Sequence, residues 1–267
     1  KTIGQRKKAM AEQAETAKNH IQHDSSTNSQ TGLQETNAPY IIIEQVTKNY
    51  YIGSREVPAL RSVDLTARRG ELVAVRGRSG SGKTTLLNLV GGLDRPTSGR
   101  ILVGGKNVGE MSEADLVKYR RSMVAFIFQH FALLSVYSAL ENVVLPQRIA
   151  GQPLAAAQER AMHCLELVDL QERIHHRPNE LSGGQQQRVA IARALALKPS
   201  VILADEPTGN LDLRTGLTIM RLLRSVAEEE QMAILVATHD PAMMDTAHRV
   251  VELRDGRLVM DEQRAKR

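Results

Sequence analysis

The sequence predicts an α/β protein with a mostly parallel sheet, and three observations support this fold class. Two apolar runs, VILAD at 201–205 and MAILVATHD at 232–240, end at polar or charged residues, as strands buried on both faces of a parallel sheet do. A third apolar run, ELVAVRG at 71–77, leads directly into a glycine-rich loop and a helix. A mostly helical pattern between about 131 and 188 is inserted into this alternation of strands and helices.

Shorter patterns predict the remaining elements. The glycine pair Gly91–Gly92 ends the helix that follows the first glycine loop. SEAD at 112–115 is a capping-box pattern for a helix through Tyr119, and the clearest helix of the inserted region is 155–170. Asp255–Gly256 favours a tight turn between two strand-like runs, which indicates a hairpin. We therefore expect the other strands at 40–46, 59–67, 100–105 and 124–128, with the hairpin at 249–260.

Residues 1–38 are rich in Gln, Thr, Ser, Asn and Ala and contain few large apolar side chains. Such a segment cannot bury enough apolar surface to fold alone, so we expect a flexible polar tail. Good helix formers within it allow a short helix around 5–20. The folded domain is accordingly predicted to span 39–267.

Charge and cysteine content narrow the class of protein. The chain has 35 Lys and Arg against 30 Asp and Glu, and no basic run or aromatic-interleaved stripe accompanies the net charge of +5, which argues against a nucleic-acid partner. The single cysteine, Cys164, excludes an intramolecular disulfide and fits a reducing compartment. His163 and the pair His175–His176 lack partners at ligand spacing, so we expect no metal site built from histidine and cysteine.

The segment 123–140 runs for eighteen residues without a formal charge, which is the lower limit for a membrane-spanning helix. Gln129 and His130 lie near its centre, where polar side chains in hydrocarbon would lack partners. We therefore expect a short buried strand followed by an apolar loop, in a soluble protein.

GRSGSGKT at 77–84 matches the eight-residue phosphate-binding loop, with a strand before it and a helix after it. Glycines permit backbone angles that are closed to other residues, so successive N–H groups can converge on phosphate oxygens. Lys83 would reach the β- and γ-phosphates, and the Thr84 hydroxyl would ligate Mg²⁺. The predicted phosphate-binding residues are Gly77, Arg78, Ser79, Gly80, Ser81, Gly82, Lys83, Thr84 and Thr85.

Two acidic residues follow the strand VILAD and complete such a site. Asp205 would lie near the Mg²⁺, usually through a water molecule. Glu206 would lie beside the γ-phosphate and orient or polarise an attacking water. Because a free glutamate has a pKa of about 4.3, it is a weak base at neutral pH unless its surroundings raise that value.

Polar and aromatic residues near other strands are further candidates. His239 follows a buried strand at the sheet edge where α/β proteins bind ligands, so we predict a γ-phosphate contact for it. Gln129 ends another strand in the same way and would contact the Mg²⁺ or the attacking water. Tyr50 and Tyr51 belong to a chain with few aromatic residues, and either could stack on a nucleobase; ordinary packing is the alternative.

A second anion site is predicted further along the chain. LSGGQ at 181–185 opens a helix with two glycines after a serine, and a helix N-terminus presents free N–H groups and a partial positive charge. One small domain therefore has two sites suited to anions.

Taken in order, the phosphate loop, Gln129, LSGGQ, ADEPTGNLD and His239 resemble the nucleotide-binding domain of an ABC transporter over about residues 40–260. The resemblance implies a phosphate-loop NTPase core, an N-terminal antiparallel β subdomain and an inserted helical subdomain at about 131–188. It also implies ATP and Mg²⁺ as ligands. Two such domains would pair head to tail, with each ATP between the phosphate loop of one copy and the signature helix of the other. The second anion site would then serve the partner's nucleotide.

The resemblance also implies roles for individual residues. Asp212, in GNLD, would couple the two nucleotide sites, and Tyr50 rather than Tyr51 would be the adenine platform. The signature residues that would bind the partner's nucleotide are Ser182, Gly183, Gly184 and Gln185.

ADEPTGNLD, GLDRPTSG and ALENVVLP resemble more closely the subfamily of lipoprotein-releasing, macrolide-exporting and antimicrobial-peptide-resistance systems. FALLSV departs from the common pattern of that subfamily, because Ser135 stands where proline is usual. The resemblance implies an ATP-hydrolysing subunit at the cytoplasmic face of the cell membrane, which powers export or mechanical coupling through a separate membrane subunit. The alternative is a non-transport cassette that regulates a cell-wall hydrolase at cell division.

All three phenylalanines lie within 126–131. We expect Phe126 and Phe128 to pack in the core as strand residues, and Phe131 with Leu133 and Leu134 to be exposed. An exposed apolar patch often marks a partner site, and in the resembling family this region receives a short helix of the membrane subunit. Simple core packing beneath the helical insertion is the alternative.

Overall fold

The computed structural model describes residues 38–264, and among them the larger of two sheets has the strand order β10-β9-β3-β8-β7-β6. All neighbouring strands of this sheet are parallel except β10, which pairs antiparallel with β9. The predicted mostly parallel sheet and the hairpin around Asp255–Gly256 are therefore confirmed. The strands are β3 (Leu72–Arg76), β6 (Val124–Phe128), β7 (Val201–Asp205), β8 (Ala233–Thr238), β9 (Arg249–Arg254) and β10 (Arg257–Gln263).

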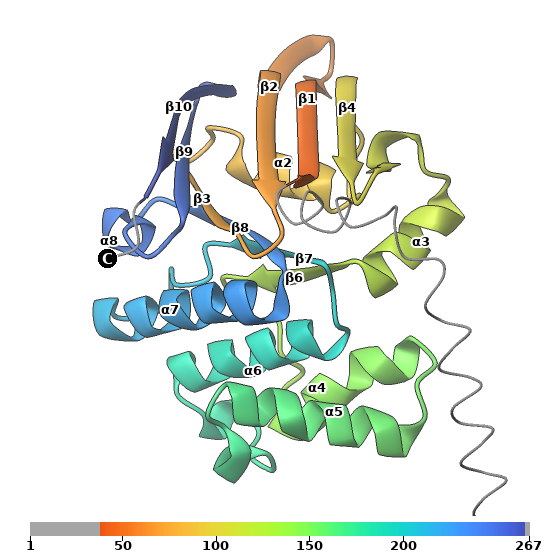
Figure 1. The fold of residues 1–267 in the computed structure, drawn as a ribbon, viewed down its shortest axis with the longest axis vertical. Coiled ribbons are helices and arrows are strands. Elements are labelled where there is room, and N and C mark those ends of the chain that lie inside the picture. The colour runs from red at the N-terminus through yellow and green to blue at the C-terminus, as the bar shows by residue number, and fades with distance from the viewer. Residues whose placement is uncertain (1–37, 265–267) are drawn as a thin grey trace, which may run out of the picture. The chain divides into compact units, whose positions relative to one another are not determined.

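The smaller sheet is antiparallel and has the order β2-β1-β4-β5 (Figure 1). Its first two strands form one long hairpin and extend well beyond the predicted 40–46 and 59–67. The outer part of this hairpin is largely polar and exposed, so it lacks the apolar alternation from which a strand is predicted. The strands are β1 (Pro39–Ile52), β2 (Arg55–Arg68), β4 (Ser98–Val103) and β5 (Lys106–Asn107).

The helices form layers on both sides of the larger sheet (Figure 1). Helix α2 contacts strands of both sheets, whereas α7 packs on the opposite face of the larger sheet and contacts α6, which in turn packs with α4 and α5. The described helices are α2 (Lys83–Val90), α3 (Glu113–Ser122), α4 (Ala139–Ile149), α5 (Leu154–Leu167), α6 (Gly183–Ala196), α7 (Leu213–Glu230) and α8 (Pro241–Met244), with short 3₁₀ turns η2 (Val108–Glu110), η3 (Gln171–Arg173) and η4 (Pro178–Glu180).

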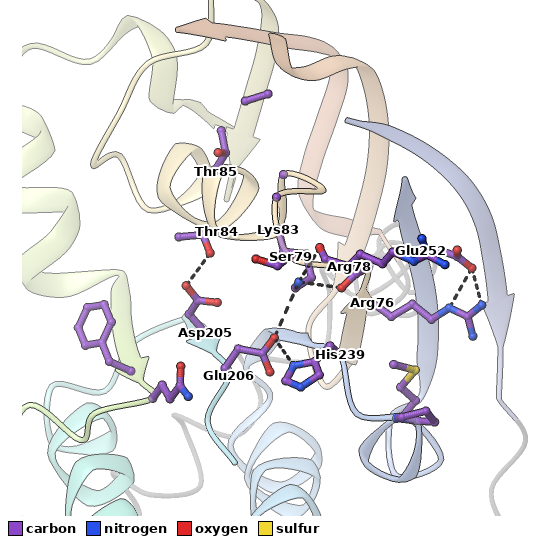
Figure 2. Close-up of a pocket in the computed structure, with 18 of the residues that line it drawn as sticks. Arg76, Arg78, Ser79, Lys83, Thr84, Thr85, Asp205, Glu206, His239 and Glu252 are labelled. Carbon is purple, nitrogen blue, oxygen red and sulfur yellow. Dashed lines mark hydrogen bonds and ion pairs between the residues drawn. The ribbon is translucent and has the colours of Figure 1, made fainter. Parts of the chain in front are cut away.

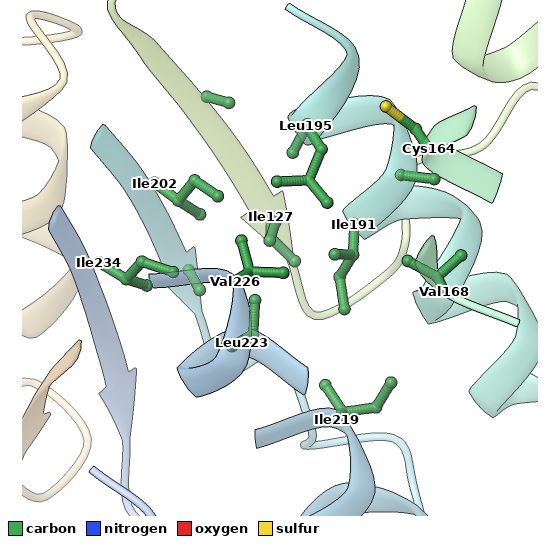
Figure 3. Close-up of a cluster of buried hydrophobic side chains, with 14 of the residues drawn as sticks. Ile127, Cys164, Val168, Ile191, Leu195, Ile202, Ile219, Leu223, Val226 and Ile234 are labelled. Atoms are coloured by element: carbon green, nitrogen blue, oxygen red, sulfur yellow. The ribbon is translucent and has the colours of Figure 1, made fainter. Parts of the chain in front are cut away.

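Two apolar clusters lie on opposite faces of the larger sheet. Ile202 and Ile234 belong to the cluster shared with α6 and α7 (Figure 3), and their neighbours Leu203 and Leu235 belong to the cluster shared with α2 and the smaller sheet. Successive side chains of a strand point to opposite faces, so β7 and β8 must be apolar throughout. This burial is the reason that both strands appear as continuous apolar runs, and it fixes the sheet edge at which Asp205 and His239 emerge.

The helical pattern of 131–188 divides into α4, α5 and the start of α6, and residues 131–137 form no helix. Ser112 caps α3 by accepting a hydrogen bond from the Asp115 amide, as predicted. The Asp115 carboxylate accepts from the Ser112 hydroxyl, however, which differs from the reciprocal backbone bond of a capping box. The predicted tail and its short helix lie outside the described residues, except for Ala38.

The expectation for the phenylalanines is partly wrong. Phe128 is 41% exposed, because β6 is the edge strand of the larger sheet and Phe128 lies at its carboxyl end. Phe131 and Leu133 are half-buried rather than exposed, and Leu133 packs against the core cluster. Leu134 is 45% exposed, as expected. Among residues 38–264, no helix is both long and apolar enough to cross a membrane.

Candidate active site

The glycine-rich loop between β3 and α2 has the backbone that a phosphate cradle needs. Gly80 and Gly82 have φ angles of +78° and +106°, a region that side chains disfavour. A Cβ at Gly82 would lie 2.6 Å from the Ala59 carbonyl oxygen, whereas a Cβ at Gly80 would meet no atom within 4 Å. The loop is therefore tightly packed against β2 on one side and open on the other.

Lys83 begins α2, and its side chain turns back over the loop (Figure 2). Its Nζ donates to the carbonyl oxygens of Gly77 at 2.8 Å and Arg78 at 3.3 Å, and the residue is only 8% exposed. The loop thus holds an almost buried ammonium group beside its own backbone, where it can bind phosphate oxygens.

The next residue of α2 faces the end of β7. The Thr84 hydroxyl donates to Asp205 Oδ2 at 2.8 Å, so two of the three residues predicted to bind Mg²⁺, Thr84 and Asp205 but not Gln129, are hydrogen-bonded to each other (Figure 2). Burial raises the pKa of the Asp205 carboxyl, and the hydrogen bond from Thr84 opposes that shift. A hydroxyl and a carboxylate at this position suit a hard cation that also takes phosphate oxygens.

Glu206 lies between the lysine and the histidine. Its Oε1 is 2.9 Å from His239 Nδ1 and 3.8 Å from Lys83 Nζ (Figure 2). Glu206 has a φ of +47°, and its amide donates to the Ala237 carbonyl oxygen at 2.9 Å, so β8 holds the residue in an unfavourable backbone conformation. Such conformations cluster at functional sites, and here this one turns the carboxylate toward the phosphate loop.

A pocket of about 1110 Å³ brings the predicted catalytic residues together. Gln129 and Phe128 line it from the end of β6, with Asp205 and Glu206 from β7 and His239 from β8. The lining residues from the loop and α2 are Gly77, Arg78, Ser79, Gly80, Gly82, Lys83, Thr84 and Thr85.

Gln129 is fixed by the segment that follows β7. Its Nε2 donates to Asn210 Oδ1 at 3.3 Å, and Asn210 Nδ2 donates to the Gln129 carbonyl oxygen at 2.9 Å. A Cβ at Gly209 would lie 2.8 Å from Gln129 Nε2, so a side chain at this position would displace the Gln129 amide. Gln129 is therefore coupled to the chain that leads toward Asp212.

Ser81 is the exception within the phosphate loop. Its side chain is buried and does not line this pocket, and its Oγ has no hydrogen-bond partner among the described residues. It lines a smaller pocket beside the turn between β9 and β10. The Ser81 amide donates to the Arg78 carbonyl oxygen at 3.1 Å, so neither its side chain nor its amide is directed to the phosphate pocket here.

The signature residues lie elsewhere in the chain's fold, since none of 182–185 lines the phosphate pocket. Ser182 and Gln185 form a reciprocal capping box at the start of α6. The amides of Gly183 and Gly184 open the helix and have no intrahelical acceptor, which leaves them for an anion. Asp212 caps α7 through the Thr215 amide, and hydrogen bonds from the Thr215 hydroxyl and then its amide lower the pKa of the Asp212 carboxyl.

Neither candidate aromatic residue lines the phosphate pocket. Tyr50 is 39% exposed, and its hydroxyl donates to Asp94 Oδ2 at 2.9 Å. The same hydroxyl also interacts with Thr85, which does line the pocket. Tyr51 is 68% exposed. Tyr50 is therefore the tyrosine beside the phosphate loop, at the rim of the site.

Sequence reasoning missed seven residues that line the pocket, which are Ala59, Arg76, Phe128, His130, Pro241, Met244 and Glu252. Phe128 was expected in the core, although its position at the end of an edge strand places it here. Arg76 ends β3 and donates through Nε to Glu252 Oε2 of β9 at 2.9 Å. Arg76 could have been identified from the sequence because it is a positively charged residue at the end of an otherwise apolar strand.

These residues fit a nucleoside triphosphate. The open face at Gly80, the lysine over the loop and the free amides supply positive potential for a polyphosphate. Among the described residues, no group of three or more His, Cys, Asp or Glu could hold a metal ion. This donor set fits Mg²⁺, which commonly takes one or two protein ligands and completes its shell with phosphates and water.

Comparison with known proteins identifies the family of this chain. The family model described as "ABC transporter" matches residues 60–209. The lipoprotein-releasing system ATP-binding protein LolD of Chromohalobacter salexigens is 47% identical over 82% of this chain and 92% of LolD. The macrolide export ATP-binding/permease protein MacB of Hyphomonas neptunium is 48% identical over 84% of this chain, but that match covers only 34% of MacB.

A solved structure agrees with the fold. The dimeric, post-hydrolysis structure of the ATP-binding cassette MJ0796 with ADP and Pi has a TM-score of 0.77 and 40% identity, over 85% of this chain and 99% of that one. The resemblance found in the motifs, including that to the lipoprotein-releasing and macrolide-exporting subfamily, is confirmed by these matches. The chain belongs to the ABC transporter family, as one of its ATP-hydrolysing cassettes.

Proposed function

We propose that this chain is the ATP-binding subunit of a membrane complex, in which two copies close on two ATP molecules and drive a separate membrane subunit. The separation of two anion sites within one copy carries this function. The pocket at the phosphate loop contains the Asp205 and Glu206 carboxylates. The N-terminus of α6 does not line that pocket in its own copy. Head-to-tail pairing would give each helix N-terminus a nucleotide, and the related MJ0796 cassette, which is dimeric with ADP and Pi bound, supports the pairing of two copies.

In this proposal each residue of the pocket has a defined task. Lys83 and the loop amides bind the β- and γ-phosphates, and Thr84 with Asp205 holds Mg²⁺. An ion held by Thr84 and Asp205 would supply positive charge that stabilises the transferred phosphoryl group. Glu206 accepts a proton from the attacking water, while His239 contacts the γ-phosphate and orients the Glu206 carboxylate.

Gln129 lines the phosphate pocket, and Ala132 and Leu134, a few residues further along the chain, line the surface that we assign to the membrane subunit. A second pocket of about 430 Å³ is lined by Leu134, Ile149, Leu145 and Leu197, with Arg120, Arg121 and Arg193 among its other lining residues. Leu134 and Ile149 are 45% and 61% exposed. An apolar hollow of this kind on a protein surface suits a short helix of a partner. Docking there would place the chain at the cytoplasmic face of the membrane.

Purification of the full chain in mild detergent from its native membranes tests this function. A membrane protein with several spanning helices should co-purify, and ATP hydrolysis should depend on Lys83 and Glu206. The identity of that protein separates export from mechanical coupling to an extracytoplasmic domain, such as control of a cell-wall hydrolase. If only soluble proteins co-purify, the proposed role is wrong.

Charge introduced into the apolar hollow should weaken the complex. The double variant Leu134→Asp, Ile149→Asp leaves the half-buried Phe131 in place, so the domain should fold. Its binding to the co-purified membrane protein should fall by about tenfold or more, since two apolar contacts would be replaced by desolvated charges. Pull-down with purified components measures this loss. The matched control is Leu154→Asp, Val259→Asp, which adds the same charge at exposed apolar positions outside the hollow.

A further inference from the structure

Tyr50 is held by two charged residues that no motif assigns. Asp94, in the segment between α2 and β4, accepts the Tyr50 hydroxyl at 2.9 Å and the Lys48 ammonium at 2.6 Å. The Lys48 Nζ also donates to the Arg95 carbonyl oxygen at 2.8 Å and lies 4.9 Å from the centre of the Tyr50 ring. The three side chains form a closed triangle that restrains the ring in position and tilt.

The triangle is attached to rigid parts of the fold. The Asn49 amide donates to Thr97 Oγ1 at 3.0 Å, and the Thr97 amide donates to the Thr47 carbonyl oxygen at 2.8 Å. These bonds fasten the segment that contains Asp94 to β1. Burial raises the pKa of the Tyr50 hydroxyl, and the nearby Thr85 side chain of α2 opposes that shift. Tyr50 therefore lies close to the helix that begins at the phosphate loop.

Lys48 covers one face of the ring. Its side chain is only 12% exposed, and an ammonium group over a tyrosine ring is attracted by the π-electrons. Alternate residues of a strand share a face, so Lys48 and Tyr50 lie on the same side of β1 while Tyr51 points to the other. A planar ligand can therefore stack only on the face of Tyr50 that Lys48 leaves open.

We propose that Asp94 and Lys48 are positioning residues for nucleobase binding, which hold Tyr50 so that its open face stacks on the base of a nucleoside triphosphate. This inference rests on the proposed function, because it takes the phosphate loop as the site of the triphosphate. It adds that affinity for the base depends on a carboxylate 44 positions from the tyrosine that it holds. It also separates recognition of the base from recognition of the phosphates.

Affinities for two probes, Mg·ATP and Mg·tripolyphosphate, test the inference by calorimetry on the full chain. Tripolyphosphate lacks a base, so it reports the phosphate loop alone. Tyr50→Ala should weaken ATP binding by about 5- to 100-fold, the usual range for loss of a stacked base. Asp94→Ala and Tyr50→Phe should each weaken it by about three- to tenfold through loss of the anchoring hydrogen bond. Tripolyphosphate binding should be unchanged in all three.

The double variant Asp94→Ala, Tyr50→Phe should be no weaker than either single variant, because both remove the same bond. Tyr51→Ala is the matched control and should bind both probes like the parent protein. Tyr50→Phe retains the ring and its burial, so it answers the question even if Asp94→Ala folds poorly. Equal weakening of both probes, unchanged ATP binding by Tyr50→Phe, or additive single effects would overturn the positioning role. A parent protein that binds neither probe would instead refute the proposed function.

Discussion

Replacing Lys83 with alanine is expected to abolish ATP binding at concentrations that saturate the parent protein. The ammonium group lies against the Gly77 and Arg78 carbonyl oxygens and is almost buried, so its removal leaves those dipoles facing the phosphates without a compensating charge. Arg76 cannot replace it, because its guanidinium is paired with Glu252. A charge-assisted contact in such a site is worth about 1.5–3 kcal/mol in itself, and a loop that has lost its cation repels a polyphosphate further.

The measurement is titration with a fluorescent ATP analogue, with circular dichroism to check folding. Alanine is a good first-turn residue, so α2 should form as before. Lys118→Ala is the control, since Lys118 is a cation in α3 with a 78% exposed side chain and does not line the site. An analogue that binds Lys83→Ala as tightly as the parent protein would show that the lysine has no role in the cradle.

The sequence predicted those parts of the site that depend on consecutive residues. The phosphate loop could be predicted because its glycines and Lys83 are neighbours in the sequence, and Lys83 hydrogen-bonds to the loop itself. Asp205 and His239 were placed by strands whose continuous apolar pattern requires burial on both faces. Once those strands are parallel neighbours, their ends must meet at one edge.

Other parts depend on contacts between distant segments, which periodicity does not report. Phe128 continues an apolar run, and nothing in that run indicates that the strand is at the edge of the sheet, where its last side chain is exposed to the pocket. The bond between Tyr50 and Asp94 joins β1 to the segment between α2 and β4, 44 positions further along the chain. The φ of +47° at Glu206 likewise comes from tertiary contacts, since no glycine marks the position.

The α6 N-terminus shows a different limit. Its capping box is visible in the sequence as Ser182 and Gln185 three positions apart, and the structure contains it. What the helix N-terminus binds is a property of two copies and not of one chain. An experiment that measures whether two copies dimerise is therefore needed to show whether the α6 N-terminus forms half of a nucleotide site.

Glu206→Gln should convert the protein into a stable dimer in ATP. The amide keeps the shape of the carboxylate and can occupy the same strained backbone, but it cannot accept a proton from water. Hydrolysis should slow by about a hundredfold or more, the usual scale for a positioned acid–base group. ATP binding should survive because Lys83, Thr84 and the loop amides are unchanged. ATP would then persist between the phosphate loop of one copy and the Gly183 and Gly184 amides of the other.

Light scattering coupled to size-exclusion chromatography, with and without ATP, measures this dimer, and Ser182→Arg added to Glu206→Gln should dissolve it. A bulky side chain there would block the γ-phosphate, but it would also remove the α6 cap, at a cost of about 1 kcal/mol. Ser112→Arg controls for loss of the cap, because the Ser112 side chain accepts from the Asp115 amide as the Ser182 side chain accepts from the Gln185 amide, and Ser112 does not line the phosphate pocket. Glu206→Gln, Ser112→Arg should therefore still dimerise. If Glu206→Gln remains monomeric in saturating ATP even with its membrane partner, or if Ser182→Arg leaves the dimer intact, then the two anion sites of the chain do not meet across an interface.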